Sequence, residues 1–125
     1  MSGSGRCLCG AVSYEVDGPL RGVSVCHCVE CRRWHGNPGG YTAAPREAIR
    51  LTGEQHLRWV DSPESNSNAR RGFCGECGSS LFWDAPGSDQ LSIAAGTLDL
   101  PTGLRTVVHI YTGDASDYYE VDPTP

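Results

Sequence analysis

The sequence predicts a mainly β fold, in a single domain of small antiparallel sheets. Runs in which apolar and polar residues alternate recur along the chain, and most of them end at turn residues. No stretch longer than about ten residues keeps the periodicity of an amphipathic helix. Glycine (16 residues) and proline (8 residues) are frequent, so the chain is expected to turn often.

The first clear strand is predicted at 10–16, where Val12, Tyr14 and Val16 alternate with polar residues before an Asp-Gly-Pro turn. Six further runs have a strand-like composition with less regular alternation. They are RGVSVCH (21–27), GGYTAA (39–44), QHLRWV (55–60), SSLFWD (79–84), QLSIAAG (90–96) and TVVHIYT (106–112).

Two other segments have a different character. Residues 45–51 could form a single helical turn that begins at Pro45. Residues 61–72 are polar and rich in turn formers, which predicts a surface loop.

The length of 125 residues suits one domain, predicted at 5–121, followed by a frayed tail at 122–125. Hydrophobic residues make up 38% and aromatic residues 8% of the chain. Such a composition provides only a modest apolar core, so we expect another source of stability to support burial.

The charge of the chain is unsuited to a polyanionic partner. The formal net charge is −5, the pI is about 5.2, and all ten cations are arginine. A nucleic-acid surface normally requires a basic excess, so no nucleic-acid partner is expected. The sequence shows no apolar run of about 20 residues and no signal-peptide pattern, which predicts a cytoplasmic protein that does not insert into a membrane.

Cysteine is the residue type that points to chemistry. Seven cysteines cannot all form intramolecular disulfides, so metal binding is favoured. A C-x-C pair occurs twice, and a C-x-x-C pair with a glycine after each cysteine occurs once. Side chains at positions i and i+2 of a strand share a face, so each C-x-C pair could bind one metal ion while His27 points away.

The preferred division of the cysteines gives two groups. The four-cysteine group is Cys7, Cys9, Cys74 and Cys77; the three-cysteine group is Cys26, Cys28 and Cys31. Four protein ligands are typical of structural zinc, and three are typical of catalytic zinc. Cys31 follows Cys28 at a C-x-x-C spacing of its own, which favours this division.

Two alternatives stay open at the level of sequence. Cys26 and Cys28 could instead join the C-x-x-C pair to make the closed site. The three-cysteine group could also recruit His35 or His109 and be a second structural site.

Five motifs carry a resemblance to a known family. In chain order they are GRCLCGAVSYEV, CHCVECRRWHG, FCGECGSSLFW, AGTLD and HIY. Together they resemble the glutathione-dependent formaldehyde-activating enzyme family, which includes centromere protein V, over about Gly5 to Val121. The resemblance implies a mainly β domain of small antiparallel sheets organised around two zinc sites. It also implies that the four-cysteine group binds a structural zinc, and that the zinc of the three-cysteine group accepts the sulfur of glutathione.

One region departs from the family pattern. Family members often follow HIY or HIW with a lysine and then a Trp-Tyr pair. Here the sequence continues TGDASDYYEV, with no lysine, and Tyr118 stands where tryptophan is usual. The contribution of this region to substrate choice is therefore an open question for sequence reasoning.

The predicted activity is that of a carbon-sulfur lyase or synthase. A thiol that coordinates zinc is deprotonated, and the resulting sulfur nucleophile could add to formaldehyde to give an S-hydroxymethyl-thiol. Glutathione carries two carboxylates, so cations are expected near the metal. The residues predicted to contact substrate are Arg32, Arg33, Trp34, Arg46 and His109, with Arg71 as a further cation. The partners would be a small thiol such as glutathione and a small aldehyde.

Two other functions share these features. The protein could carry glutathione or its adduct without accelerating a reaction, since thiols add to formaldehyde unaided. It could also be a structural two-zinc interaction module.

Overall fold

The computed structural model describes residues 2–62 and 68–121. In these ranges the strands are β1 (Gly3–Arg6), β2 (Ser13–Val16), β3 (Val23–Cys26), β4 (Gly39–Pro45), β5 (Ile49–Thr52), β6 (Leu57–Asp61), β7 (Arg70–Cys74), β8 (Ser80–Asp84), β9 (Gln90–Ala94) and β10 (Thr106–Ile110). The helix α1 spans Val29–His35. Short 3-10 turns cover Arg46–Ala48 (η1), Glu54–His56 (η2), Ala95–Thr97 (η3) and Thr112–Asp114 (η4).

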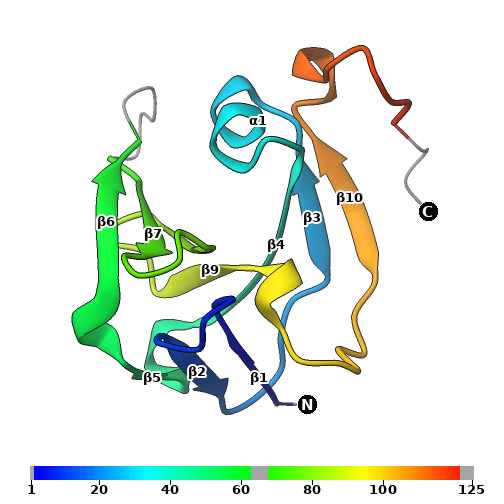
Figure 1. Ribbon diagram of the computed structural model, residues 1–125. Coiled ribbons are helices and arrows are strands. Elements are labelled where there is room, and N and C mark those ends of the chain that lie inside the picture. The colour runs from blue at the N-terminus through cyan, green and yellow to red at the C-terminus, as the bar shows by residue number, and fades with distance from the viewer. Residues whose placement is uncertain (1, 63–67, 122–125) are drawn as a thin grey trace.

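The strands form two sheets, one small and one large. The small sheet is antiparallel, with the order β1-β2-β5, and the large sheet has the order β10-β3-β4-β9-β8-β7-β6. Figure 1 shows the large sheet curving from β6 round to β10, with the small sheet at one end and α1 at the other. The protein is therefore a mainly β domain, as the alternating pattern predicts.

One feature of the large sheet differs from the prediction of small antiparallel sheets. Strand β10 pairs with β3 in parallel, so this seven-stranded sheet is mixed. A parallel neighbour requires a long connection between the two strands. Here the connection runs through most of the fold, and pairing over such a separation leaves no local signal in the sequence.

The seven predicted strands all form, as β2, β3, β4, β6, β8, β9 and β10. The sequence analysis missed β1, β5 and β7. Strands β1 and β7 are short and carry glycine and arginine in place of a regular alternation, whereas β5 (IRLT) does alternate but overlaps the segment 45–51, for which a helical turn was expected. The predicted loop at 61–72 is too long, since Asp61 ends β6 and Arg70 begins β7. Its centre, 63–67, and the predicted tail at 122–125 lie outside the described residues. The single turn expected in 45–51 is η1.

Helix α1 was not predicted, because its seven residues are too few for a periodic pattern. Its two ends are defined by caps. The Sγ of Cys28 accepts a hydrogen bond from the backbone amide of Cys31, and Gly36 ends the helix in the left-handed conformation at φ 69°. Within 2–62 and 68–121, no helix has the length and apolar character that a bilayer-spanning segment needs.

The main core lies where the small sheet packs on β8 and β9. Tyr14 of β2 is 2% exposed, and its ring contacts the ring of Phe82 edge-on at 5.7 Å. The Tyr14 hydroxyl lies 2.7 Å from the hydroxyl of Thr97 in η3, which ties the small sheet to the end of β9. Cys7 and Cys74 belong to this core, whereas Cys26 and Cys31 belong to a second, smaller cluster with Tyr41 and Ala94.

Candidate functional site

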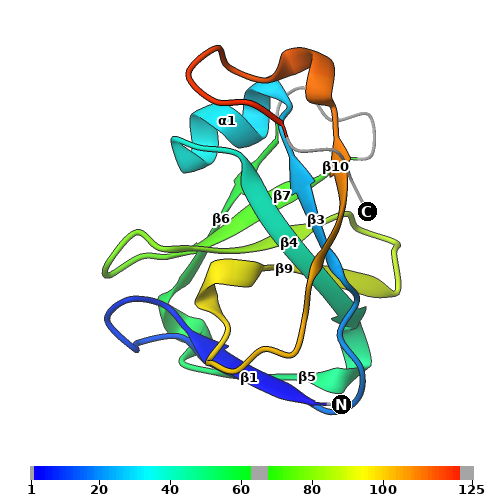
Figure 2. The same ribbon diagram turned by 90° about the vertical axis from the view of Figure 1, so that its right-hand side faces the viewer.

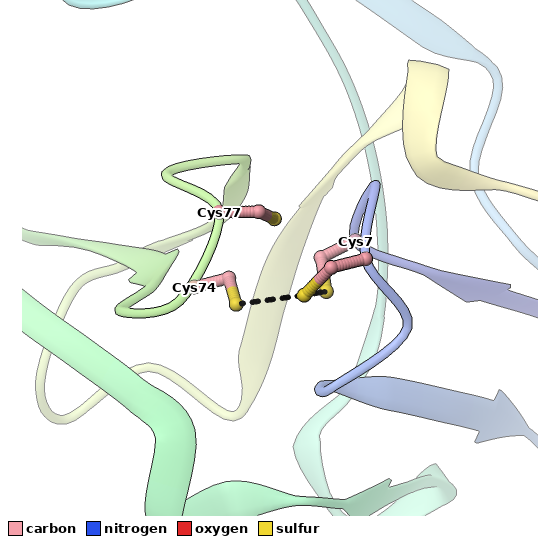
Figure 3. A group of neighbouring side chains, drawn as sticks. Cys7, Cys74 and Cys77 are labelled. Carbon is pink, nitrogen blue, oxygen red and sulfur yellow. Dashed lines mark hydrogen bonds between the residues drawn. The ribbon is translucent and has the colours of Figure 1, made fainter.

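The four-cysteine group is built from two turns that face each other. Cys7 and Cys9 lie in the turn after β1, Cys74 ends β7, and Cys77 lies in the turn that follows. Figure 3 shows Cys74 and Cys77 on one side of the group and Cys7 on the other. The four sulfur atoms all lie within 4.8 Å of one another.

The sulfur separations fit a tetrahedral metal ion. Cys7 Sγ is 3.7 Å from Cys9 Sγ, and Cys9 Sγ is 3.8 Å from Cys74 Sγ. A tetrahedral zinc with bonds of about 2.3 Å requires sulfur atoms about 3.8 Å apart, whereas a disulfide requires about 2.05 Å. All seven cysteines are free. The four-cysteine group could therefore hold such an ion.

Polar hydrogens turn toward the sulfurs of this group. The amide of Val12 donates to Cys7 Sγ and the amide of Glu76 to Cys74 Sγ, both at 3.4 Å. The hydroxyl of Ser79 lies 3.1 Å from Cys77 Sγ, and this hydrogen bond lowers the pKa of Cys77 to about 5. These contacts stabilise thiolates, which is the form that binds metals.

The three-cysteine group forms where β3 meets α1. Cys26 ends β3, Cys28 is the N-cap of α1, and Cys31 lies in its first turn. Their sulfur atoms also lie within 4.8 Å of one another, so this group too could hold a metal ion. The strand-based reason for expecting each C-x-C pair to converge is wrong in detail. In both pairs the second cysteine lies in a turn beyond the strand, and it is the turn that brings the sulfurs together.

The structure brings together the same two groups that the preferred division predicts, and not the alternative that joins Cys26 and Cys28 to the C-x-x-C pair. No histidine or carboxylate of residues 2–62 and 68–121 completes the three-cysteine group. His27 points away, as expected, with its ring nitrogens 2.6 Å from the Tyr119 hydroxyl and 3.0 Å from His109 Nδ1. His35 Nε2 lies 2.6 Å from the Tyr41 hydroxyl instead.

Arg71 of β7 contacts this group directly. Its side chain is 5% exposed; Nη2 donates to Cys31 Sγ at 3.5 Å, Nη1 donates to the Tyr41 hydroxyl at 3.3 Å, and Nη2 lies 3.7 Å from the carboxylate of Glu30. Hydrogen bonds from Cys26 and from Arg71 lower the pKa of Cys31 to about 6, and the proton shared with Cys31 raises the pKa of Cys26. Arg71 therefore places a buried guanidinium beside Cys31, which favours the thiolate form of that residue.

The predicted substrate contacts have three different locations. Arg32 and Arg33 follow Cys31 in α1; the buried Arg32 Nε has no hydrogen-bond partner among the described residues, while Arg33 is exposed. Trp34 lines a cavity beside the group. Arg46 is remote, because it follows the far end of β4, about 20 Å along the strand from the residue opposite Cys26.

Arg46 has a structural partner of its own. Its Nη2 donates to the carboxylate of Asp84 at 2.7 Å, and Arg70 Nε donates to the other carboxylate oxygen at 2.9 Å. The prediction that Arg46 contacts substrate gains no support from this position.

His109 is also turned away from the cysteines. It lies on β10 against His27, beside a cavity of about 350 Å³ that the C-terminal segment closes. That segment passes next to α1 in both views (Figure 1 and Figure 2), and the Tyr118 hydroxyl donates to Asn37 at 2.6 Å. Tyr118, at the position where the family pattern has tryptophan, is 63% exposed.

Sequence reasoning missed Tyr41 and considered His35 only as a possible further ligand of the three-cysteine group. Tyr41 lies on β4, and its hydroxyl joins His35 to Arg71 beside the three-cysteine group. The tyrosine was visible in the run GGYTAA, but its place at the site depends on the pairing of β4 with β3. The spacing of residues in the sequence does not indicate which strands pair.

A family model described as glutathione-dependent formaldehyde-activating enzyme matches residues 2–114. The match covers nearly the whole chain, including all seven cysteines. The chain belongs to this family. The resemblance inferred from five short motifs is therefore confirmed.

A solved structure supports the fold of this family member. It is a Rhodobacter sphaeroides protein determined as a structural-genomics target, 24% identical in sequence, with a TM-score of 0.66. The alignment covers 85% of this chain and 98% of that one. No curated protein matches the sequence. Membership of the glutathione-dependent formaldehyde-activating enzyme family thus suggests the chemistry, while the structural likeness concerns the fold alone.

Proposed function

We propose that this protein is a zinc-dependent carbon-sulfur lyase or synthase that condenses a thiol such as glutathione with formaldehyde. In the forward reaction the sulfur bonds to the carbonyl carbon, and the thiol proton ends on the oxygen to give an S-hydroxymethyl-thiol. The observation that carries the proposal is the three-cysteine group, which no further ligand from the described residues completes. It lies in the same domain as a four-cysteine group, in a chain whose family acts on formaldehyde and glutathione.

The two groups would divide the metal chemistry between them. Four thiolates suit a structural zinc, and three thiolates suit a zinc that also accepts a substrate ligand. Zinc bound to the three cysteines would supply a site at which an incoming thiol is held in its deprotonated form. We propose Cys7, Cys9, Cys74 and Cys77 as ligands of the first ion and Cys26, Cys28 and Cys31 as ligands of the second.

Residues of the chain prepare the three-cysteine group for this role. Arg71 places a permanent positive charge against Cys31, which offsets part of the negative charge of three thiolates. Tyr41 accepts a hydrogen bond from Arg71 and thereby fixes the guanidinium. Because Arg71 is buried and already bonded to Cys31 and Tyr41, Arg32 and the exposed Arg33 of α1 remain the candidates for contact with the carboxylates of glutathione.

Free thiols also suit a reducing compartment, and on that ground we expect the protein to be cytoplasmic. Metal analysis of the purified protein, after reconstitution with zinc, should give two zinc ions per chain. A stoichiometry that stays below two after reconstitution would contradict the assignment of the second site.

Exchange spectroscopy by NMR on a mixture of formaldehyde and glutathione tests the reaction itself. We expect the zinc-loaded protein to increase the rate at which free glutathione and its S-hydroxymethyl adduct interconvert, and we expect Cys28→Ser to abolish the increase. An unchanged exchange rate together with measurable glutathione binding would replace the enzyme with a carrier. An unchanged rate without binding would leave only a structural role for the two metal groups.

A further inference from the structure

A cavity of about 600 Å³ opens beside the three-cysteine group, and the proposed chemistry gives it no role. It is lined by Trp34, His35, Val60, Phe73, Gly78 and Ser80. Its volume lies within the range of about 300–1,000 Å³ that is usual for small-molecule sites.

The cavity lies between α1 and one face of β6 and β7. Residues opposite each other in an antiparallel pair point to the same side of the sheet. Val60 is opposite Arg71, and Phe73 is two residues further along β7, so all three share one face. The ring of Trp34 contacts Phe73 edge-on at 5.7 Å, which places α1 over this face.

The wall of the cavity is close to the three-cysteine group. Cys31, Trp34 and His35 occupy positions i, i+3 and i+4 of α1 and hence one side of the helix. A series of contacts of 2.6, 3.3 and 3.5 Å links His35 to the Cys31 sulfur through Tyr41 and Arg71. The cavity and the three-cysteine group are therefore neighbouring regions of the fold, separated by the side chains of Tyr41 and Arg71.

The lining residues that the structure describes are uncharged at pH 7. The polar atoms of Trp34 and Ser80 are paired with each other, since Trp34 Nε1 donates to Ser80 Oγ at 2.9 Å. Burial, followed by the charge of Arg71, lowers the pKa of His35 to about 4, so its ring is neutral at pH 7. Val60 is 42% exposed, and with the two aromatic rings it gives the cavity an apolar wall. A carboxylate or ammonium group in contact with these apolar side chains would lose water, and no charged side chain among the described lining residues would compensate for that loss.

We propose that this cavity selects the substrate by binding an uncharged aromatic group attached to one of the two reactants, the thiol or the aldehyde. The inference rests on the proposed function and makes it more specific. The charged ends of glutathione would then lie outside the cavity, toward the exposed side of α1. A preferred substrate pair is one in which either the thiol or the aldehyde carries a ring of the size of a phenyl group.

Calorimetric binding to the zinc-loaded protein tests the inference with three probes. Glutathione is the reference, benzyl mercaptan places the ring on the thiol, and the adduct of glutathione with phenylacetaldehyde places the ring on the aldehyde carbon. We expect one of the two ring-bearing probes to bind at least about tenfold tighter than glutathione, the discrimination that a small apolar group typically provides in a well-formed pocket. Which of them does so identifies the reactant that carries the ring.

A matched pair of variants assigns the preference to the cavity. Val60→Glu introduces a charge into the wall of the cavity. It should weaken binding of the ring-bearing probe, relative to binding of glutathione, about tenfold. Val107→Glu is the control, because Val107 is similarly exposed (49%) but lies on β10, away from the cavity. It should leave the ratio of the two affinities unchanged. The inference is overturned if neither ring-bearing probe binds tighter than glutathione, or if both variants change the ratio equally.

The same measurements separate this inference from the proposed function. A preference for the ring that Val60→Glu abolishes, without any acceleration of thiol exchange, would retain the cavity and discard the enzyme. Accelerated exchange of glutathione and formaldehyde without a preference for the ring would retain the enzyme and discard the cavity.

Discussion

Two buried charged side chains, Arg71 and Asp84, are paired, and each holds together segments that are distant in the sequence. Arg71 joins β7 to α1 through Cys31 and Glu30, and Asp84 joins the ends of β8 and β7 to η1. A buried ionised side chain without a partner is strongly unfavourable, so these contacts also specify how the segments must assemble. Arg71 and Asp84 are each positioned by their own strand, whereas the groups that they pair with lie on other elements.

Asp84→Asn should destabilise the protein by about 2 kcal/mol at pH 7, the size typical of hydrogen bonds to a charged group. Burial opposes ionisation of Asp84, but the hydrogen bonds from Arg46 and Arg70 outweigh it and lower its pKa. A lowered carboxyl pKa stabilises the folded state above the unfolded pKa, and this contribution is lost as the pH falls through the folded pKa.

Urea unfolding of both proteins from pH 7 to pH 3 measures this difference. The destabilisation of Asp84→Asn should be complete at pH 7 and should shrink below about pH 4. Asp17→Asn is the control, because Asp17 forms an exposed ion pair with Arg50 and should not change stability measurably. A deficit that is independent of pH would contradict the assigned charge pair.

His35 should give the protein a second pH dependence, in a higher range. Its pKa in the folded state is about 4, whereas an unfolded histidine titrates near 6.5. The unfolded state therefore binds more protons between these values, and stability should fall as the pH falls from about 6.5 to about 4, by at most about 3 kcal/mol.

His35→Gln keeps a polar group near Tyr41 but removes the titration. Between pH 6.5 and pH 4, unfolding free energies of the variant should fall less steeply than those of the wild type. Equal slopes for the two proteins would show that His35 is accessible to protons in the folded state.

At the scale of elements, local pattern and long-range pairing contribute differently to the fold. The alternation of apolar and polar residues identified β2 and six other strands, because the apolar side chains of a strand lie on its buried face. Helix α1 could not be found in that way, since its ends depend on a cysteine N-cap and on Gly36 in a left-handed conformation. Likewise β7 begins with two arginines, and only its pairing with β6 and β8 explains why Arg71 is buried.

The turn between β5 and η2 requires a glycine at position 53. Gly53 has φ +80°, and a Cβ atom there would lie 1.8 Å from the carbonyl oxygen of Ala11. Gly53→Ala should therefore destabilise the fold by about 2 kcal/mol or more, since the strained backbone and the clash act together.

Gly96→Ala is the matched control for this turn. A Cβ atom at Gly96 would meet nothing within 4 Å, and the residue lies in η3, outside the left-handed region. Its thermal midpoint should stay close to that of the wild type, whereas the midpoint of Gly53→Ala should fall by several degrees. A similar loss in both variants would mean that the turn tolerates a side chain.

At the scale of the whole molecule, the sequence predicted the cysteine groups better than their surroundings. The C-x-C and C-x-x-C spacings are local, and an odd number of cysteines excludes a complete set of disulfides. The cavity, the position of Arg71 and the remote position of Arg46 all depend on strand order. Two segments as distant as Cys9 and Cys74, 65 residues apart, meet only because both sheets are complete.

The two groups should contribute unequally to stability. The four-cysteine group connects β1 to β7 across the core, so Cys74→Ser should abolish cooperative unfolding or prevent folding, as loss of a structural zinc typically does. Cys28→Ser changes a group that joins only β3 and α1, and it should lose one zinc ion and thiol binding while the sheets remain folded.

Circular dichroism and metal analysis of both variants check this expectation. Two equally unfolded variants, or two variants that both keep one zinc ion and a full β-sheet spectrum, would contradict the division of roles.

The parallel pairing of β10 with β3 has a consequence for biosynthesis. His109 of β10 follows its partner His27 by 82 residues, so a ribosome working at about 5–20 residues per second needs about 4–16 s to deliver the neighbour of β3. During that time the strand β3, which carries Cys26 and leads to Cys28 and Cys31, lacks its neighbour β10. All four residues of the four-cysteine group have by then been synthesised. Metal uptake is therefore expected to begin at the four-cysteine group and to reach the three-cysteine group only near release of the polypeptide.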